Sequence, residues 1–93
     1  MTEITLTSAQ MAIWLTIYRE STICTAIVSQ MEEISQFYPN GIPEDCENSF
    51  DLQIHASEKR RIIGAINKAI KMTTEKTKLS TFKTQMESLL NAA

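Results

Sequence analysis

The sequence predicts an all-α fold: a small helical bundle in which a long N-terminal helix packs against two C-terminal helices. Apolar residues recur at three- and four-residue steps along much of the chain, which is the spacing of a helix face. Only two glycines and two prolines are present among 93 residues. Because all-β folds need many turns, which use these residue types, the composition also favours helices. We expect residues 1–93 to form a single helical domain.

Residues 1–7 are expected to form an N-terminal arm, either disordered or extended, because apolar residues and threonines alternate there. A long helix is predicted over residues 8–38. The Thr7 hydroxyl can accept a hydrogen bond from the Gln10 amide, while the Gln10 side chain reaches back to the Thr7 amide. This capping box predicts that the helix begins directly after Thr7.

The predicted 8–38 helix holds the largest apolar segment of the chain, so the later segments are expected to fold onto it. Its weakest part is residues 21–28, which are rich in β-branched side chains that lose rotamer freedom in a helix. A strand there, or a bend that divides the helix in two, remains the alternative. Pro39 and Gly41 then end the helix.

Residues 39–56 are predicted to be an acidic linker, whose acids are Glu44, Asp45, Glu47 and Asp51. Acids at alternate positions are typical of a calcium loop, which also needs Gly at its sixth place and Glu at its twelfth. Phe50 and Ala56 occupy those places, so no metal site is predicted. Phe50, Leu52 and Ile54 alternate with polar residues and are expected to anchor the loop to the core.

Two further helices are predicted, a basic one over residues 57–73 and a second over residues 74–92. The apolar face of the first consists of Ile62, Ile63, Ile66, Ala69 and Ile70. The stripe of the second consists of Leu79, Phe82, Met86, Leu89 and Leu90. Residues 73–75 are either a break between the two helices or a weak point in one continuous helix.

The charges are divided between the two halves of the chain, although the net charge is only −2. Residues 1–55 hold one base against eight acids, and residues 56–93 hold eight bases against three acids. We expect the acidic linker to lie near the basic helix and to attract it. Head-to-tail self-association, or a partner bound by one pole, is also compatible with this layout.

A second apolar face of the 8–38 helix consists of Met11, Trp14, Leu15 and Tyr18, beside a core stripe through Ile13, Ile17, Cys24 and Ile27. In one interpretation the bundle wraps the helix on most sides and buries both faces. In the other, Trp14 and Tyr18 are anchors for a partner protein, as aromatic residues often are at interfaces. The second interpretation predicts a homo-oligomer or a complex with another protein.

A basic patch on the 57–73 helix consists of Lys59, Arg60, Arg61, Lys68 and Lys71. Together with the bases that follow as far as Lys83, it is similar to a phosphate-contacting stripe. A nucleic-acid-associated regulator that binds through residues 57–83 is therefore the alternative function. The acidic net charge of the chain weighs against it. Membrane binding is not predicted, since the apolar face of this helix lacks Trp and Tyr.

No catalytic, cofactor-binding or metal-binding residue is predicted. Cys46 and His55 are too few for a zinc site, and no Gly-rich turn or oxyanion donor supports them as a catalytic pair. The spacing of Cys24 and Cys46 is not that of a disulfide framework, and no secretory signal precedes the apolar run. A cytoplasmic location is therefore expected.

Residues 6–14, Leu-Thr-Ser-Ala-Gln-Met-Ala-Ile-Trp, resemble the opening motif of peptide-synthetase condensation domains. The resemblance is confined to this short segment. The chain is much shorter than that fold and has a single histidine, whereas the family uses a catalytic pair. No function is therefore assigned from it.

The function that these observations favour is a non-enzymatic protein–protein interaction module, such as a small inhibitor, an adaptor or a chaperone-like subunit. The apolar face with Trp14 is expected to bind the partner, and the protein is expected to be oligomeric. Salt dependence would separate this function from the alternative, because binding to phosphates weakens steeply as salt rises.

Overall fold

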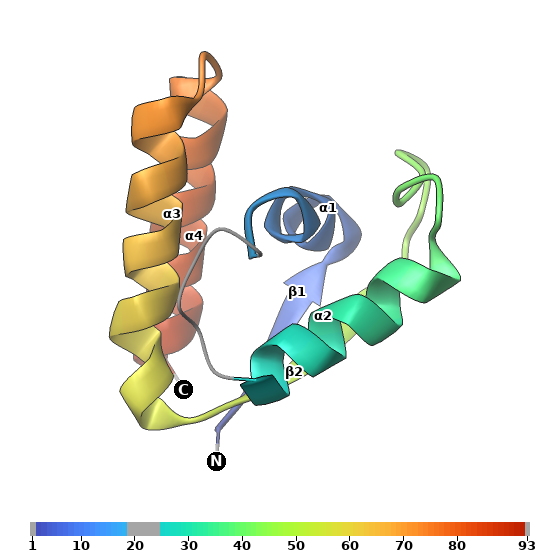
Figure 1. Cartoon of the computed structure of the whole chain (residues 1–93), viewed down its shortest axis with the longest axis horizontal. Coiled ribbons are helices and arrows are strands. Elements are labelled where there is room, and N and C mark those ends of the chain that lie inside the picture. Colours follow the sequence, from blue (N-terminus) through green and yellow to red (C-terminus); the bar gives the residue numbers. More distant parts are fainter. Residues whose placement is uncertain (1, 19–24, 93) are drawn as a thin grey trace.

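Four α-helices and a two-stranded antiparallel sheet make up the fold in the computed structural model, which describes residues 2–18 and 25–92 (Figure 1). In chain order the elements are β1 (Thr2–Thr7), α1 (Ser8–Ile17), α2 (Thr25–Phe37), β2 (Ser49–Ile54), the 3-10 helix η2 (Ala56–Glu58), α3 (Lys59–Met72) and α4 (Lys76–Ala92). The predicted all-α class is therefore wrong, because two segments that were expected to be an arm and a linker pair as strands.

The sheet forms because β1 and β2 each alternate apolar and polar side chains and share one buried face. The strands are antiparallel, with Ile4 opposite Leu52, and both of these side chains are buried. On the exposed face, the Thr5 hydroxyl donates to the Asp51 carboxylate at 2.7 Å, across 46 positions of sequence. A pairing over this distance has no local turn signal, which explains why it was missed.

The single helix predicted over residues 8–38 is also wrong, since α1 ends at Ile17 and α2 begins at Thr25. The two helices pack against different neighbours: α1 contacts α3, α4 and the sheet, whereas α2 contacts β2. Within the ambiguous segment, residues 25–28 are helical, and residues 21–24 lie outside the described residues.

The predicted start of α1 is confirmed by its capping box. The Thr7 hydroxyl accepts a hydrogen bond from the Gln10 amide at 3.2 Å, and the Gln10 side chain accepts one from the Thr7 amide at 2.9 Å. The helix contains no charged residue, and apolar side chains lie on all of its sides. A helix of this kind has no polar face to turn towards water.

α3 and α4 are separate helices that form an antiparallel hairpin, as Figure 1 shows. The break lies at residues 73–75, where the Thr73 hydroxyl accepts a hydrogen bond from the Glu75 amide at 3.1 Å. Both helices begin two residues later than predicted. Most residues of their predicted apolar stripes are buried: Ile62, Ile66, Ala69, Leu79, Phe82, Met86 and Leu90. The predicted Ile63, Ile70 and Leu89 are half-buried, and the structure adds Ala65 to the buried set.

The core lies where the apolar face of the sheet, α1 and the α3–α4 hairpin meet, and Ile27 and Met31 of α2 are also buried in it. In Figure 1, α1 is seen end-on between this hairpin and α2. α2 is fixed to the edge of β2 by Gln30, whose side-chain amide pairs with both the N–H and the C=O of Gln53 at 2.9 Å. One side of α1 is not covered by these elements, and the candidate functional site lies there.

Candidate functional site

The side chains that were predicted to bind a partner lie in the core of the structure. Met11, Trp14 and Tyr18 are 0 to 1 % exposed, and Leu15 is half-buried against the core. The Trp14 ring packs against Phe82 of α4, with 6.5 Å between the ring centroids. These side chains are therefore enclosed by the rest of the chain, as in the interpretation in which the bundle wraps the helix.

The opposite side of α1 forms the floor of a groove of about 760 Å³, which we call the α1 groove. The floor residues are Ser8, Ala9, Ala12, Ile13, Thr16 and Ile17. Ile13 and Ile17 were expected to belong to a core stripe. Ile17 is buried, but Ile13 is only half-buried and faces the groove. The face with Trp14 is therefore in the core. Among the described residues of the other predicted stripe, Ile17 and Ile27 are also buried, and Ile13 lies open to the groove.

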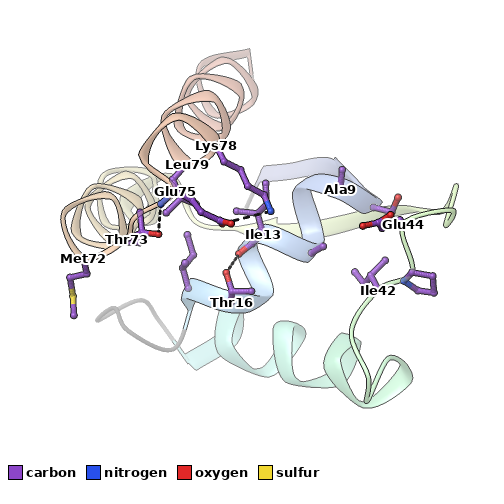
Figure 2. A pocket seen from close by; sticks show the side chains of 15 residues that line it. Ala9, Ile13, Thr16, Ile42, Glu44, Met72, Thr73, Glu75, Lys78 and Leu79 are labelled. Atoms are coloured by element: carbon purple, nitrogen blue, oxygen red, sulfur yellow. Dashed lines mark hydrogen bonds and ion pairs between the residues drawn. The ribbon is translucent and has the colours of Figure 1, made fainter.

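Two segments that are distant in sequence form the walls of the α1 groove. One wall is the loop at Ile42, Pro43 and Glu44, and the other is the junction of α3 and α4, with Ala69, Met72, Thr73, Glu75, Lys78 and Leu79. Figure 2 shows Ile13 and Thr16 in the middle, between Met72 on one side and Ile42 on the other. The Met72 side chain is 71 % exposed, so an apolar surface extends from the floor over the rim.

The hydroxyl groups around the α1 groove are already used within the chain. Ser8 donates to the carbonyl of Cys46, Thr16 donates to the carbonyl of Ile13 at 2.6 Å, and Thr73 accepts from the Glu75 amide. Small-molecule sites usually place a few polar groups to orient their ligand. The α1 groove therefore presents mainly apolar surface, with charges confined to its rim.

The rim of the α1 groove carries more negative than positive charge. Glu75 and Lys78 form an ion pair at 4.0 Å on the helical wall. On the loop wall, Glu44 is exposed and is followed by the exposed acids Asp45 and Glu47. No base occurs in the loop over residues 38–48. The loop wall is therefore acidic, and no basic residue of the same loop neutralises its charge.

All five residues of the predicted basic patch lie on α3. Arg60, Arg61, Lys68 and Lys71 are exposed, and Lys59 is half-buried. Arg61 is 3.5 Å from the buried carboxylate of Glu58 and so takes part in a local ion pair. The structure adds Lys83 of α4, which lines a shallow hollow of about 480 Å³ together with Lys59, Arg60, Gly64 and Asn67. We call these exposed bases of α3 and Lys83 the basic face.

The expected attraction between the acidic linker and the basic helix stays a prediction. Three ion pairs join described residues: Arg61 with Glu58, Lys78 with Glu75 and Lys83 with Glu87. Each joins residues three or four positions apart within the C-terminal half. None of these three pairs joins the acidic linker to the basic helix.

Within residues 2–18 and 25–92, no cluster of three or more His, Cys, Asp or Glu side chains is arranged to hold a metal ion. The same residues include no helix with the length and apolar character needed to cross a membrane. Cys46 is half-buried beside the α1 groove, and His55 is exposed after β2. Cys24 lies outside the described residues.

The α1 groove was missed because its floor and its two walls come from three separate segments. One signal for it was present in the sequence: α1 is apolar on every side, so any side that the core does not cover is an apolar surface. Comparisons with protein families, with curated proteins and with solved structures found no match to this chain.

Proposed function

We propose that the chain is a non-enzymatic protein-binding module, of the inhibitor, adaptor or chaperone-like kind, that holds an apolar segment of another protein in the α1 groove. The observation that carries this proposal is the open apolar side of α1, bounded by two walls. Isolated apolar residues are common on protein surfaces, but a continuous apolar groove with a charged rim is typical of an interaction site.

Three features support a protein segment as the ligand. The volume of about 760 Å³ accommodates several side chains. The hydroxyl groups of Ser8, Thr16 and Thr73 are bonded within the chain, which leaves few groups to orient a polar small molecule. Met72 adds a flexible apolar side chain at the rim, and methionine adapts well to varied partners.

A photo-crosslinking amino acid at position 9 tests this function. Ala9 lines the α1 groove, and Ala26 is its matched control, because each is the exposed second residue of its helix and only Ala9 faces the groove. In an extract of the source organism, we expect position 9 to crosslink to a discrete protein that position 26 does not capture. Equal products from both positions, or none from position 9, would contradict the proposal.

The basic face supports a second candidate, a nucleic-acid-associated regulator. The eight bases of residues 56–93 lie on the α3–α4 hairpin, and the structure brings Lys83 beside Arg60. Its test is the substitution of Arg60→Glu with Lys71→Glu in a binding titration with duplex DNA and RNA at several salt concentrations. This candidate requires binding that falls steeply with salt and is lost in the double variant.

A further inference from the structure

The most informative surface for a further inference is the α1 groove, and the inference rests on the proposed function. The strip of α1 that lines the groove consists of Ala9, Ala12, Ile13 and Thr16, which follow the spacing i, i+3, i+4, i+7. At 1.5 Å per residue, this strip is about 10 Å long, or about two helical turns. A partner helix of two to three turns matches it in length.

A helix fits the walls of the groove better than an extended strand does. Strand addition needs an open sheet edge that offers its N–H and C=O groups. The described residues that line the α1 groove come from helices and a loop, and none belongs to β1 or β2. A helix satisfies its own backbone hydrogen bonds and needs only an apolar stripe to bury.

The charges of the rim determine which residues can lie beside the apolar stripe of the partner helix. Glu44 lines the groove, and the exposed acids Asp45 and Glu47 follow it in the same loop. Lys78 on the other wall is paired with Glu75 and adds no net charge. A partner with Lys or Arg beside its apolar stripe would match this wall, whereas acidic flanks would be repelled.

A second folded copy of this chain does not supply such a helix. Its basic helices α3 and α4 bury their own apolar stripes, which include Ile62, Ile66, Phe82 and Met86. Exposing them would require the hairpin to leave the core. The occupant is therefore another protein.

We infer that the α1 groove binds a short amphipathic helix of another protein, whose apolar stripe packs on Ala12 and Ile13 and whose Lys or Arg flank faces the acidic loop wall at Glu44.

Two synthetic peptides of about 14 residues, or about 20 Å of helix, test the inference. Both carry the same Leu and Ala stripe, and their polar positions are all Lys in one peptide and all Glu in the other. We expect the Lys peptide to bind at least about tenfold more tightly in fluorescence anisotropy, as one or two charge pairs at a rim would provide. Equal affinities, or tighter binding of the Glu peptide, would overturn the inference.

Two double variants with reversed charges distinguish binding in the groove from a general attraction of the basic peptide to an acidic protein. Glu44→Lys with Asp45→Lys removes the acidic wall, and Glu32→Lys with Glu33→Lys on α2 makes the same change of net charge outside the groove. Both pairs are adjacent, exposed acids. We expect the preference for the Lys peptide to be lost in the first variant and kept in the second. A similar loss in both variants would contradict a specific site.

The position of the peptide is tested with Ala9→Arg, which places a long cation in the groove, against Ala26→Arg. We expect at least about tenfold weaker binding of the Lys peptide in the first variant only. Unchanged binding would overturn the inference. If neither peptide binds while position 9 still crosslinks to a protein, the basic helix is wrong and the proposed function stands; if crosslinking fails as well, both are wrong.

Discussion

Trp14 shows how burial changes the meaning of a substitution at the residue scale. As a surface anchor, its loss would lower partner affinity without much effect on folding. In the structure its side chain is 1 % exposed and its ring packs beside Phe82. A loss of binding in a Trp14 variant would therefore indicate that the protein has unfolded, and not that Trp14 contacts the partner.

We predict that Trp14→Ala lowers the free energy of unfolding by about 3–5 kcal/mol, because it removes a large buried side chain and leaves a cavity. The chain of 93 residues has on the order of 5–14 kcal/mol of stability in total. The measurement is urea denaturation followed by circular dichroism. The control is Phe37→Ala, which removes a side chain that is 77 % exposed and should change stability by less than about 0.5 kcal/mol. Equal effects of the two substitutions would show that Trp14 is not in the core.

The two glycines of the chain are predicted to respond in opposite ways to alanine. A methyl group added at Gly64 of α3 meets no atom within 4 Å, so Gly64→Ala should stabilise by about 0.5–1 kcal/mol through its higher helix propensity. Gly41 has a φ of 86°, where alanine is strained, so Gly41→Ala should destabilise by about 1 kcal/mol. Thermal unfolding of both variants checks the two signs, and destabilisation by Gly64→Ala would mean that a segment packs closely there.

At the element scale, the sheet depends on its attachment to α2. A two-stranded sheet has two edges, and exposed edges are prone to unwanted pairing. The Gln30 side chain closes part of the β2 edge by bonding to both backbone groups of Gln53, as a third strand would. This contact also fixes α2 to the sheet.

We predict that Gln30→Ala speeds hydrogen exchange of the Gln53 amide and lowers stability by about 1–2 kcal/mol, since two hydrogen bonds to the backbone are lost. Gln36→Ala on the exposed side of the same helix is the matched control and should leave that amide unchanged. Exchange that is equally fast in both variants would show that Gln30 does not protect the edge.

At the scale of the whole molecule, charge and apolar surface are arranged separately. The α3–α4 hairpin carries the bases on one side of Figure 1, and α2 and the acidic loop lie on the other. The sequence-based expectation of an oligomer depended on the apolar face with Trp14 and Tyr18, and both of these side chains lie in the core. Among the described residues, the large apolar side chains that remain exposed are Phe37 and Met72.

We therefore predict a monomer of 10.5 kDa across the micromolar range in sedimentation equilibrium, because a folded copy offers no apolar helix for the α1 groove and the exposed side chains of Phe37 and Met72 provide too little area for a stable dimer. Head-to-tail association of the two charged poles would instead appear as a larger mass at low salt that declines as salt is added. A larger mass that persists at high salt would indicate an apolar interface between copies.

The sequence by itself determined the features that depend on neighbouring residues. The capping box of Thr7 and Gln10, the end of the helix before Pro39 and the two C-terminal helices follow from interactions within one or two turns. The apolar stripes of α3 and α4 were also predicted, since each helix has a polar face that sets its orientation.

Only the tertiary structure decided the pairing of β1 with β2 and the orientation of α1. The strands are far apart in the chain, so the alternation within each segment is compatible with an extended form but does not identify the strand with which it pairs. α1 is apolar on every side, and its composition therefore does not specify which side is buried. The sheet and the hairpin cover the side with Trp14, where the largest apolar area can be removed from water, and the smaller side chains of Ala9 and Ala12 are left to form the groove.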